Sequence, residues 1–163
     1  FDTAQDNVLR YRTFSKAYGL AGARVGYAVG DARVIAGLER VRNQYGINLL
    51  GQVGALAALR DQDYLTQAVA QIARARDIIG RIATVNGLSP LPSATGFVAI
   101  DCGRDDRFAE RVLAALLDLD VFARKPSAAG LAHLIRVSTG VDADLDVFAE
   151  ALPKALEIAR RPA

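Results

Sequence analysis

The segment Thr13–Gly26 constrains the possible folds and functions more than any other part of the sequence. A single lysine, Lys16, follows the short apolar run Val8–Phe14, and Gly19 and Gly22 come soon after it. The apolar run has the residue types of a β-strand, which places Lys16 just past the end of that strand. In open α/β sheets, ligand sites lie beyond the carboxyl ends of the strands. The pattern therefore predicts an α/β domain with a ligand site at Lys16.

The same segment carries groups suited to covalent chemistry at an amine. The apolar run before Lys16 can partly desolvate the amine, which favours its neutral, nucleophilic form. The hydroxyls of Thr13 and Ser15 and the guanidinium of Arg24 can donate hydrogen bonds to an anion. The glycines after Lys16 let the backbone approach a bulky ligand. The alternative is an ordinary surface lysine at a strand-to-loop turn, which needs none of these neighbours.

The run Thr13–Gly22, TFSKAYGLAG, with Arg24 in register, resembles the attachment-site signature of fold-type I, pyridoxal-phosphate (PLP)-dependent aminotransferases of class I/II. It is closest to the subgroup that contains histidinol-phosphate aminotransferase. The resemblance implies an α/β fold: the end of a large PLP-binding domain with a mainly parallel sheet, then a small C-terminal α/β domain. We expect residues 1–75 to belong to the large domain, with the start of a bridging helix, and residues 76–163 to form the small domain. Because family members are more than twice as long, we also expect a C-terminal portion of a longer protein.

The resemblance assigns roles to four residues of this segment. Lys16 would bind PLP covalently and then move a proton as general acid and base. Arg24 would bind the cofactor phosphate, since its fork of donors matches phosphate oxygens. Thr13 occupies a hydroxyl position that contacts this phosphate in the family. Ser15 either contributes a second hydroxyl or points away, because neighbouring residues in extended structure alternate faces.

Two arginines further along the chain are candidates for binding substrate. Arg136 lies in the apolar stretch Leu134–Gly140, where a charge requires an anionic partner. In the family such an arginine binds the substrate carboxylate, and the alternative is an ion pair with Asp or Glu. Arg124 resembles a second arginine at the substrate end, and it is alternatively a solvated charge before Pro126. In the family the loop containing Asn48 borders the mouth of the active site, although ordinary turn chemistry explains it equally well.

Composition excludes several classes of function. Twenty basic residues against eighteen acidic ones do not form a nucleic-acid-binding footprint, and no run approaches the ~20 apolar residues that span a membrane. With one His and one cysteine, Cys102, the sequence argues against a Cys/His metal site. A single cysteine also fits a reducing, cytoplasmic compartment. We therefore expect small-molecule partners, an amino acid and a 2-oxo acid, without nucleic acid, membrane or metal. A homodimer is implied by the resemblance.

Periodicity and capping signals predict alternating strands and helices. We expect strands at Val8–Phe14, Arg24–Gly30, Gly96–Asp101, Val121–Arg124 and Ala132–Ser138, and helices from Asp31 to Arg42, Gly51 to Arg60, Tyr64 to Val85, Asp106 to Leu119 and Asp142 to Arg160. Residues Phe1–Asn7 are expected to be irregular, and Ser89–Ser93 to be an extended connector. Asp31 and Asp142 are the expected N-caps of their helices. Apolar spacing predicts an inward stripe on three helices: Val34, Ile35, Leu38 and Val41 on the first, Phe108, Val112, Ala115, Leu116 and Leu119 on the fourth, and Leu145, Phe148, Leu152 and Leu156 on the last. Asn86-Gly87 predicts a left-handed helix end.

Three functions fit these observations. The first is an aminotransferase, acting on histidinol phosphate with 2-oxoglutarate or on an aromatic amino acid. The second is a PLP-dependent decarboxylase or lyase of the same fold. The third is a non-catalytic, aminotransferase-like effector domain of a transcription regulator. The parts of the family's site that precede the lysine are absent from these residues, so we expect the 163-residue chain alone to be inactive.

Overall fold

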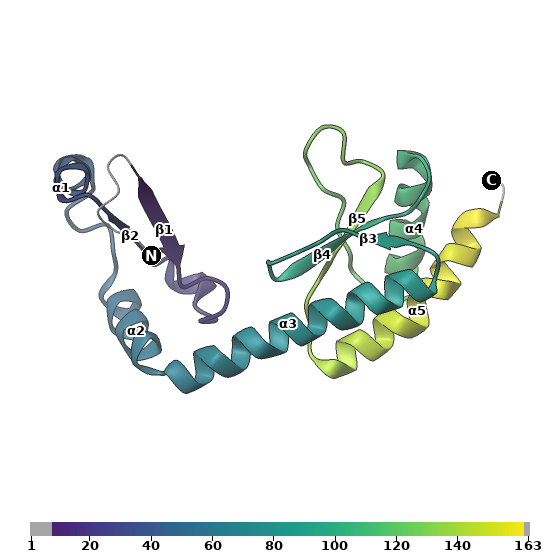
Figure 1. Ribbon diagram of the computed structural model, residues 1–163, viewed down its shortest axis with the longest axis horizontal. Coiled ribbons are helices and arrows are strands. Elements are labelled where there is room, and N and C mark those ends of the chain that lie inside the picture. Colours follow the sequence, from purple (N-terminus) through teal and green to yellow (C-terminus); the bar gives the residue numbers. More distant parts are fainter. Residues whose placement is uncertain (1–7, 162–163) are drawn as a thin grey trace. The chain divides into compact units, whose positions relative to one another are not determined.

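The computed structural model describes residues 8–161, and the chain divides into two compact units, Phe1–Val69 and Ala70–Ala163. The predicted irregular segment Phe1–Asn7 lies outside the described residues. Helix α3, Gln62–Val85, contains both the division between the units and the predicted domain boundary after residue 75 (Figure 1). The assignment of the two parts to a large and a small domain stays a proposal.

The first unit begins with a two-stranded sheet. Strand β1, Leu9–Thr13, pairs antiparallel with β2, Gly26–Gly30, so that Thr13 lies opposite Gly26. Both strands were predicted, with slightly longer bounds. The mainly parallel sheet expected of the large domain does not occur among the described residues, whose strand pairings are all antiparallel. No α-helix crosses over between β1 and β2, and a chain that returns directly pairs antiparallel.

The 3-10 turn η1, Ala21–Ala23, lies in the connection between β1 and β2. Two α-helices follow β2: α1, Ala32–Val41, and α2, Leu49–Arg60. As predicted, Asp31 caps α1, and its Oδ1 accepts a hydrogen bond from the Arg33 amide at 2.9 Å. The predicted apolar stripe of α1 is not buried among the described residues, and Val41 is 81% exposed.

The second unit has a three-stranded antiparallel sheet in the order β3-β4-β5. Its elements are β3, Ser89–Pro90, β4, Phe97–Asp101, α4, Asp106–Asp118, β5, Leu134–Ser138, and α5, Asp142–Arg160. Residues 89–90 were expected to be a connector, but they pair with β4. The prediction of a strand at Val121–Arg124 is wrong, because only Arg124 of this segment makes a β-bridge, to Arg136.

The core of this unit lies between one face of the sheet and three helices. Alternate residues of β4 and β5 are buried on that face: Val98, Ile100, Ile135 and Val137. The C-terminal part of α3 runs alongside α5 (Figure 1), and Arg74 of α3 bonds Asp142 of α5 at 3.1 Å. The predicted inward residues of α4 and α5 are confirmed. Eight of them are buried: Phe108, Val112, Ala115, Leu116, Leu145, Phe148, Leu152 and Leu156; the ninth, Leu119, is partly buried and packs against them. Each large apolar side chain buried in this way contributes about 1.5–3 kcal/mol to folding.

The ends of the helices follow local chemistry. Gly87 has φ +75°, and the Leu88 amide bonds the Ala83 carbonyl at 3.0 Å, which confirms the predicted left-handed end of α3. The N-cap of α5 is Val141 rather than the predicted Asp142, and the Val141 amide donates to Asp144 Oδ2 at 3.1 Å. Within residues 8–161, no helix has the length and apolar character needed to cross a membrane.

Candidate functional site

Lys16 lies in the connection between β1 and β2, and backbone hydrogen bonds hold this connection in one shape. The Phe14 amide bonds the Val25 carbonyl at 3.1 Å and extends the β-ladder by one rung. The Leu20 amide bonds the Phe14 carbonyl at 2.9 Å, and the Gly19 amide bonds the Lys16 carbonyl at 2.8 Å. Gly19 has φ +69°, a conformation that costs glycine little. The backbone of Lys16 is therefore held on both sides.

A small apolar cluster anchors this connection to α2. Phe14, Val25 and Ala55 are 2%, 8% and 7% exposed, and the Tyr18 ring lies 4.8 Å from the Phe14 ring between centroids. A residue that alternates with Phe14 along extended backbone points to the other side. Burial of Phe14 therefore directs the neighbouring polar groups away from the cluster.

The side chain of Asn48 makes a second link between α2 and the connection. Its Oδ1 accepts from the Gly51 amide at 2.6 Å and caps α2, which is why the helix begins two residues before the predicted Gly51. Its Nδ2 donates to the Ala23 carbonyl at 3.2 Å. From the sequence, Asn48 fitted either a loop at the mouth of an active site or an ordinary turn. The available signal was an Asn just before an Ala- and Leu-rich helix.

The hydroxyls of Thr13 and Ser15 lie side by side. Thr13 Oγ1 donates to Ser15 Oγ at 2.9 Å and accepts from the Ser15 amide at 3.0 Å. A local side-chain-to-backbone bond of this kind turns the chain after Thr13 and keeps the Ser15 hydroxyl beside that of Thr13. Lys16 itself is exposed. The expectation that the residues before it desolvate the amine is not met among the described residues.

Arg24 ends the connection in a strained backbone conformation. Its φ of 55° and ψ of 44° fall in the left-handed region, which costs a non-glycine residue about 1 kcal/mol or more. Its Nη1 donates to the Ala21 carbonyl at 2.8 Å, and the side chain is exposed. Two hydroxyls, a guanidinium and an amine are thus carried by one braced connection. This donor set suits a phosphate and a carbonyl group.

In the second unit, the structure brings together the two arginines predicted to bind substrate. The Arg124 amide bonds the Arg136 carbonyl at 3.0 Å, and the Arg136 amide bonds the Arg124 carbonyl at 2.7 Å. Residues paired in this way present their side chains on the same face of a sheet. Among the described residues neither arginine forms an ion pair, so the alternative of a structural pair with Asp or Glu finds no support there.

The environments of the two arginines differ. Arg136 is half-buried, and its Nε is enclosed without a hydrogen-bond partner in residues 8–161. Its guanidinium carbon lies 4.8 Å from the centre of the Phe97 ring. Arg124 is exposed, with its guanidinium carbon 5.7 Å from the Phe122 ring. Phe97 could not be recognised from the sequence as a partner of Arg136, because pairing across strands, and not a local pattern, brings the two side chains together.

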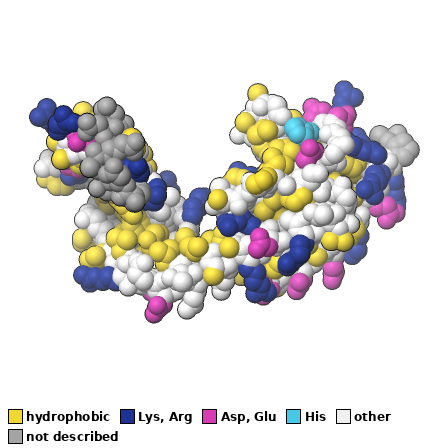
Figure 2. All heavy atoms as spheres, viewed as in Figure 1, with side chains coloured by type: hydrophobic (Ala, Val, Ile, Leu, Met, Phe, Trp, Pro, Cys, Tyr) yellow, Lys and Arg dark blue, Asp and Glu magenta, His cyan; other side chains and the backbone are white. Residues whose placement is uncertain are grey.

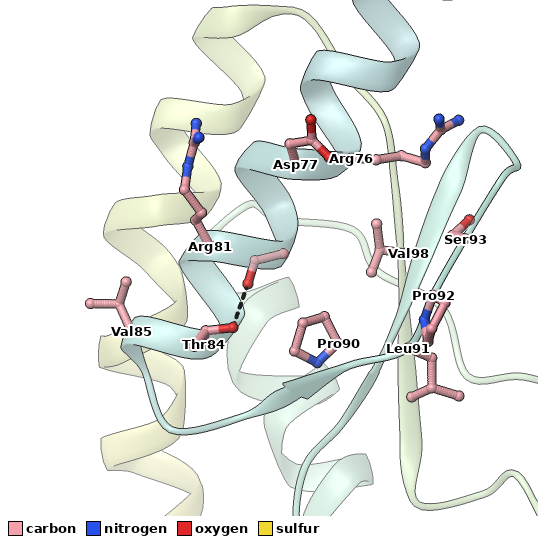
Figure 3. Close-up of a pocket in the computed structure, with 11 residues that line it drawn as sticks. Arg76, Asp77, Arg81, Thr84, Val85, Pro90, Leu91, Pro92, Ser93 and Val98 are labelled. Atoms are coloured by element: carbon pink, nitrogen blue, oxygen red, sulfur yellow. Dashed lines mark hydrogen bonds between the residues drawn. The ribbon is translucent and has the colours of Figure 1, made fainter.

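A pocket of about 770 Å³ lies elsewhere in the second unit, between α3 and strands β3 and β4 (Figure 3). Its walls include Pro90, Leu91 and Val98, and they contain none of the predicted site residues. The Thr84 hydroxyl turns back to the Gly80 carbonyl of its own helix at 2.9 Å. The pocket is therefore not the candidate site.

Comparisons with known proteins agree with this geometry. The family model "Aminotransferase class I and II" matches residues 1–152. A histidinol-phosphate aminotransferase from Geotalea daltonii is 38% identical over 86% of this chain and 40% of its own length. Histidinol-phosphate aminotransferase 2 from Pseudomonas aeruginosa is 41% identical over 92% of this chain and 40% of its own length. The chain thus spans about 40% of the length of these curated relatives.

A solved structure is similar over most of the chain. Histidinol-phosphate aminotransferase from Sinorhizobium meliloti, in complex with pyridoxal-5'-phosphate, superposes with a TM-score of 0.87 at 48% identity, over 93% of this chain and 41% of that one. The α/β fold is therefore that of the fold-type I transferases. The chain belongs to the class I and II aminotransferase family.

Proposed function

We propose that the full-length protein is a PLP-dependent aminotransferase. It moves an amino group between an amino acid or amino-alcohol phosphate and a 2-oxo acid, with histidinol phosphate as the first candidate donor and an aromatic amino acid as the next. The observation that carries this proposal is the braced Lys16 connection in a member of this family. The similarity to a solved histidinol-phosphate aminotransferase with bound PLP supports it.

The residues present suit the cofactor. The adjacent hydroxyls of Thr13 and Ser15 and the guanidinium of Arg24 would hold its phosphate, and Lys16 Nζ would bind its aldehyde carbon. When bound, PLP supplies an electron sink for negative charge at the substrate α-carbon. The exposure of Lys16 leaves the amine accessible to cofactor and substrate.

The chain's own contribution to the reaction is attachment, proton transfer and orientation. Lys16 Nζ would hold the cofactor covalently until a substrate amine takes its place. The released Nζ would then take a proton from the substrate α-carbon and return it, as general base and acid. The backbone hydrogen bonds around Lys16 and Gly19 hold the backbone of Lys16 in place during this exchange.

Arg136, with Arg124 beside it, would bind the anionic group of the substrate. Two guanidinium groups on one sheet face, without an acidic partner among the described residues, attract a carboxylate or phosphate. The half-buried Arg136 gives the stronger contact, because charge-assisted hydrogen bonds strengthen as water is excluded.

A homodimer is the oligomeric state that we propose. Helix α2 exposes leucines on several sides: Leu49, Leu50, Leu56 and Leu59 are 72%, 85%, 51% and 41% exposed, and Figure 2 shows hydrophobic side chains gathered over this part of the chain. A helix that is apolar all round is normally buried. Further parts of the full-length protein and a second copy would cover it. A cytoplasmic location is also a proposal, and it rests on the single, reduced Cys102.

The proposal is tested by trapping the cofactor on the full-length protein. Borohydride reduction after incubation with PLP, followed by peptide mapping, should mark Lys16. Lys16→Ala should lose both the label and transamination, whereas Lys154→Ala, at an exposed position on α5, should keep both. A label that persists in Lys16→Ala would refute the assignment.

Substrate assays separate the other two functions. Transfer of an amino group from histidinol phosphate or an aromatic amino acid to 2-oxoglutarate supports the aminotransferase. Release of carbon dioxide from the substrate would instead identify a decarboxylase. A labelled Lys16 without any turnover would favour an effector domain.

A further inference from the structure

The guanidinium of Arg136 rests against an aromatic ring rather than an acidic partner. Its central carbon lies 4.8 Å from the Phe97 ring centre, within the ~6 Å range of cation–π contacts. Strand register explains the contact: Arg136 pairs with Ala99 of β4, and Phe97 is the diagonal neighbour on the same sheet face. Because Ala99 carries only a methyl group, the long arginine side chain can cross it to reach the ring.

The Phe97 ring is itself mounted on a rigid corner. The Phe97 carbonyl accepts from Ser93 Oγ at 2.6 Å and from Thr95 Oγ1 at 3.2 Å. The preceding carbonyl, that of Gly96, accepts from both the amide and the hydroxyl of Thr139, at 3.0 and 3.1 Å. Four hydrogen bonds thus fix the backbone that presents the ring, and Thr139 follows the end of β5 directly.

This arrangement limits the directions in which Arg136 can donate. Its Nε is buried and has no partner among the described residues, so the remaining donors of the fork carry the interaction with an anion. A guanidinium held against a ring has fewer orientations open to it, and bidentate binding of a carboxylate or phosphate requires a defined orientation of its planar fork. Without the ring, the side chain would regain rotamer freedom and lose that direction.

We infer that Phe97 is a positioning residue that holds the Arg136 guanidinium in the orientation that binds the substrate's anionic group. The inference rests on the proposed role of Arg136 in binding substrate. Phe97 does not contact the reacting atoms. It affects substrate affinity only by orienting the Arg136 guanidinium.

A double-mutant cycle on the full-length enzyme tests this inference. Phe97→Leu should raise KM for the anionic substrate about tenfold, the loss expected for a partly desolvated cation–π contact, and should change kcat little. Phe97→Tyr keeps the ring and should stay near the wild-type KM. Phe97→Met, which fills a similar volume without a ring, should resemble Phe97→Leu and replaces it if that variant unfolds.

The cycle is completed in an Arg136→Gln background, where Phe97→Leu should add no further rise in KM. Val98→Ala is the matched control, because Val98 is 3% exposed on the opposite sheet face; it should lower stability without a selective change in KM. An equal rise in KM from Phe97→Leu with and without Arg136 would overturn the inference. An unchanged KM in Arg136→Gln would also overturn it, yet labelling of Lys16 and transamination would still stand as separate support for the proposed function.

Discussion

Replacing Gly51 by alanine should loosen the braced connection that carries Lys16. A Cβ at residue 51 would lie 2.6 Å from Val25 Cγ2, 3.0 Å from the Ala23 carbonyl oxygen and 3.1 Å from Asn48 Nδ2. Carbon atoms in favourable contact lie about 3.5–4.0 Å apart, so the new methyl group overlaps a buried side chain. Overpacking of this kind costs about 1–3 kcal/mol.

The same helix offers a matched control. A Cβ at Gly54 would meet only Leu20 Cδ1, at 4.0 Å, which is an ordinary contact. Gly54→Ala should therefore gain about 0.5–1 kcal/mol from helix propensity. Because both glycines lie inside α2, the gain in helix propensity is common to the two variants, and they should differ by the overpacking cost alone, about 1–3 kcal/mol.

Urea denaturation of the full-length protein, with the unfolding midpoint as the readout, measures this difference. Because Val25 and Ala23 flank Arg24, Gly51→Ala should also weaken PLP binding, by up to about tenfold if 1.4 kcal/mol of the strain persists in the bound state. Equal or greater stability of Gly51→Ala compared with Gly54→Ala would refute the reasoning.

Two further predictions concern single side chains. Asn48→Ala should cost about 1 kcal/mol of unfolding free energy, measured by urea denaturation, through loss of the α2 cap; Asn48→Asp keeps the cap acceptor, loses the bond to the Ala23 carbonyl, and should weaken PLP binding more than stability. Burial, with a smaller effect of the Asp101 charge, raises the pKa of the Cys102 thiol from 9.0 to about 11. Alkylation at pH 8 should therefore be slow in the folded protein and rapid in urea. Rapid alkylation of the folded protein would contradict the assigned burial of Cys102. The unfolded chain loses the thiol proton at a lower pH than the folded chain does, so the thiol's contribution to stability should fall as the pH rises from about 9 to 11.

The sequence by itself determined the local features of this protein. The signature around Lys16 identified the family, and the period of the apolar residues predicted the buried faces of α4 and α5, including Phe148 and Leu152. Asp31 could be recognised as a cap from the sequence because capping is local: its carboxylate accepts from the amide of Arg33, only two positions further on. These predictions succeeded because the interactions involved repeat along a helix or join near neighbours.

Only the tertiary structure decided which distant residues meet. The pairing of Arg124 with Arg136 and the cation–π contact of Arg136 with Phe97 depend on strand register, and a shift of one residue would send either side chain to the opposite face. Likewise, Asn48 reaches the Ala23 carbonyl across 25 positions of sequence. Contacts of this kind are set by how whole elements pack, and no short stretch of sequence records that packing.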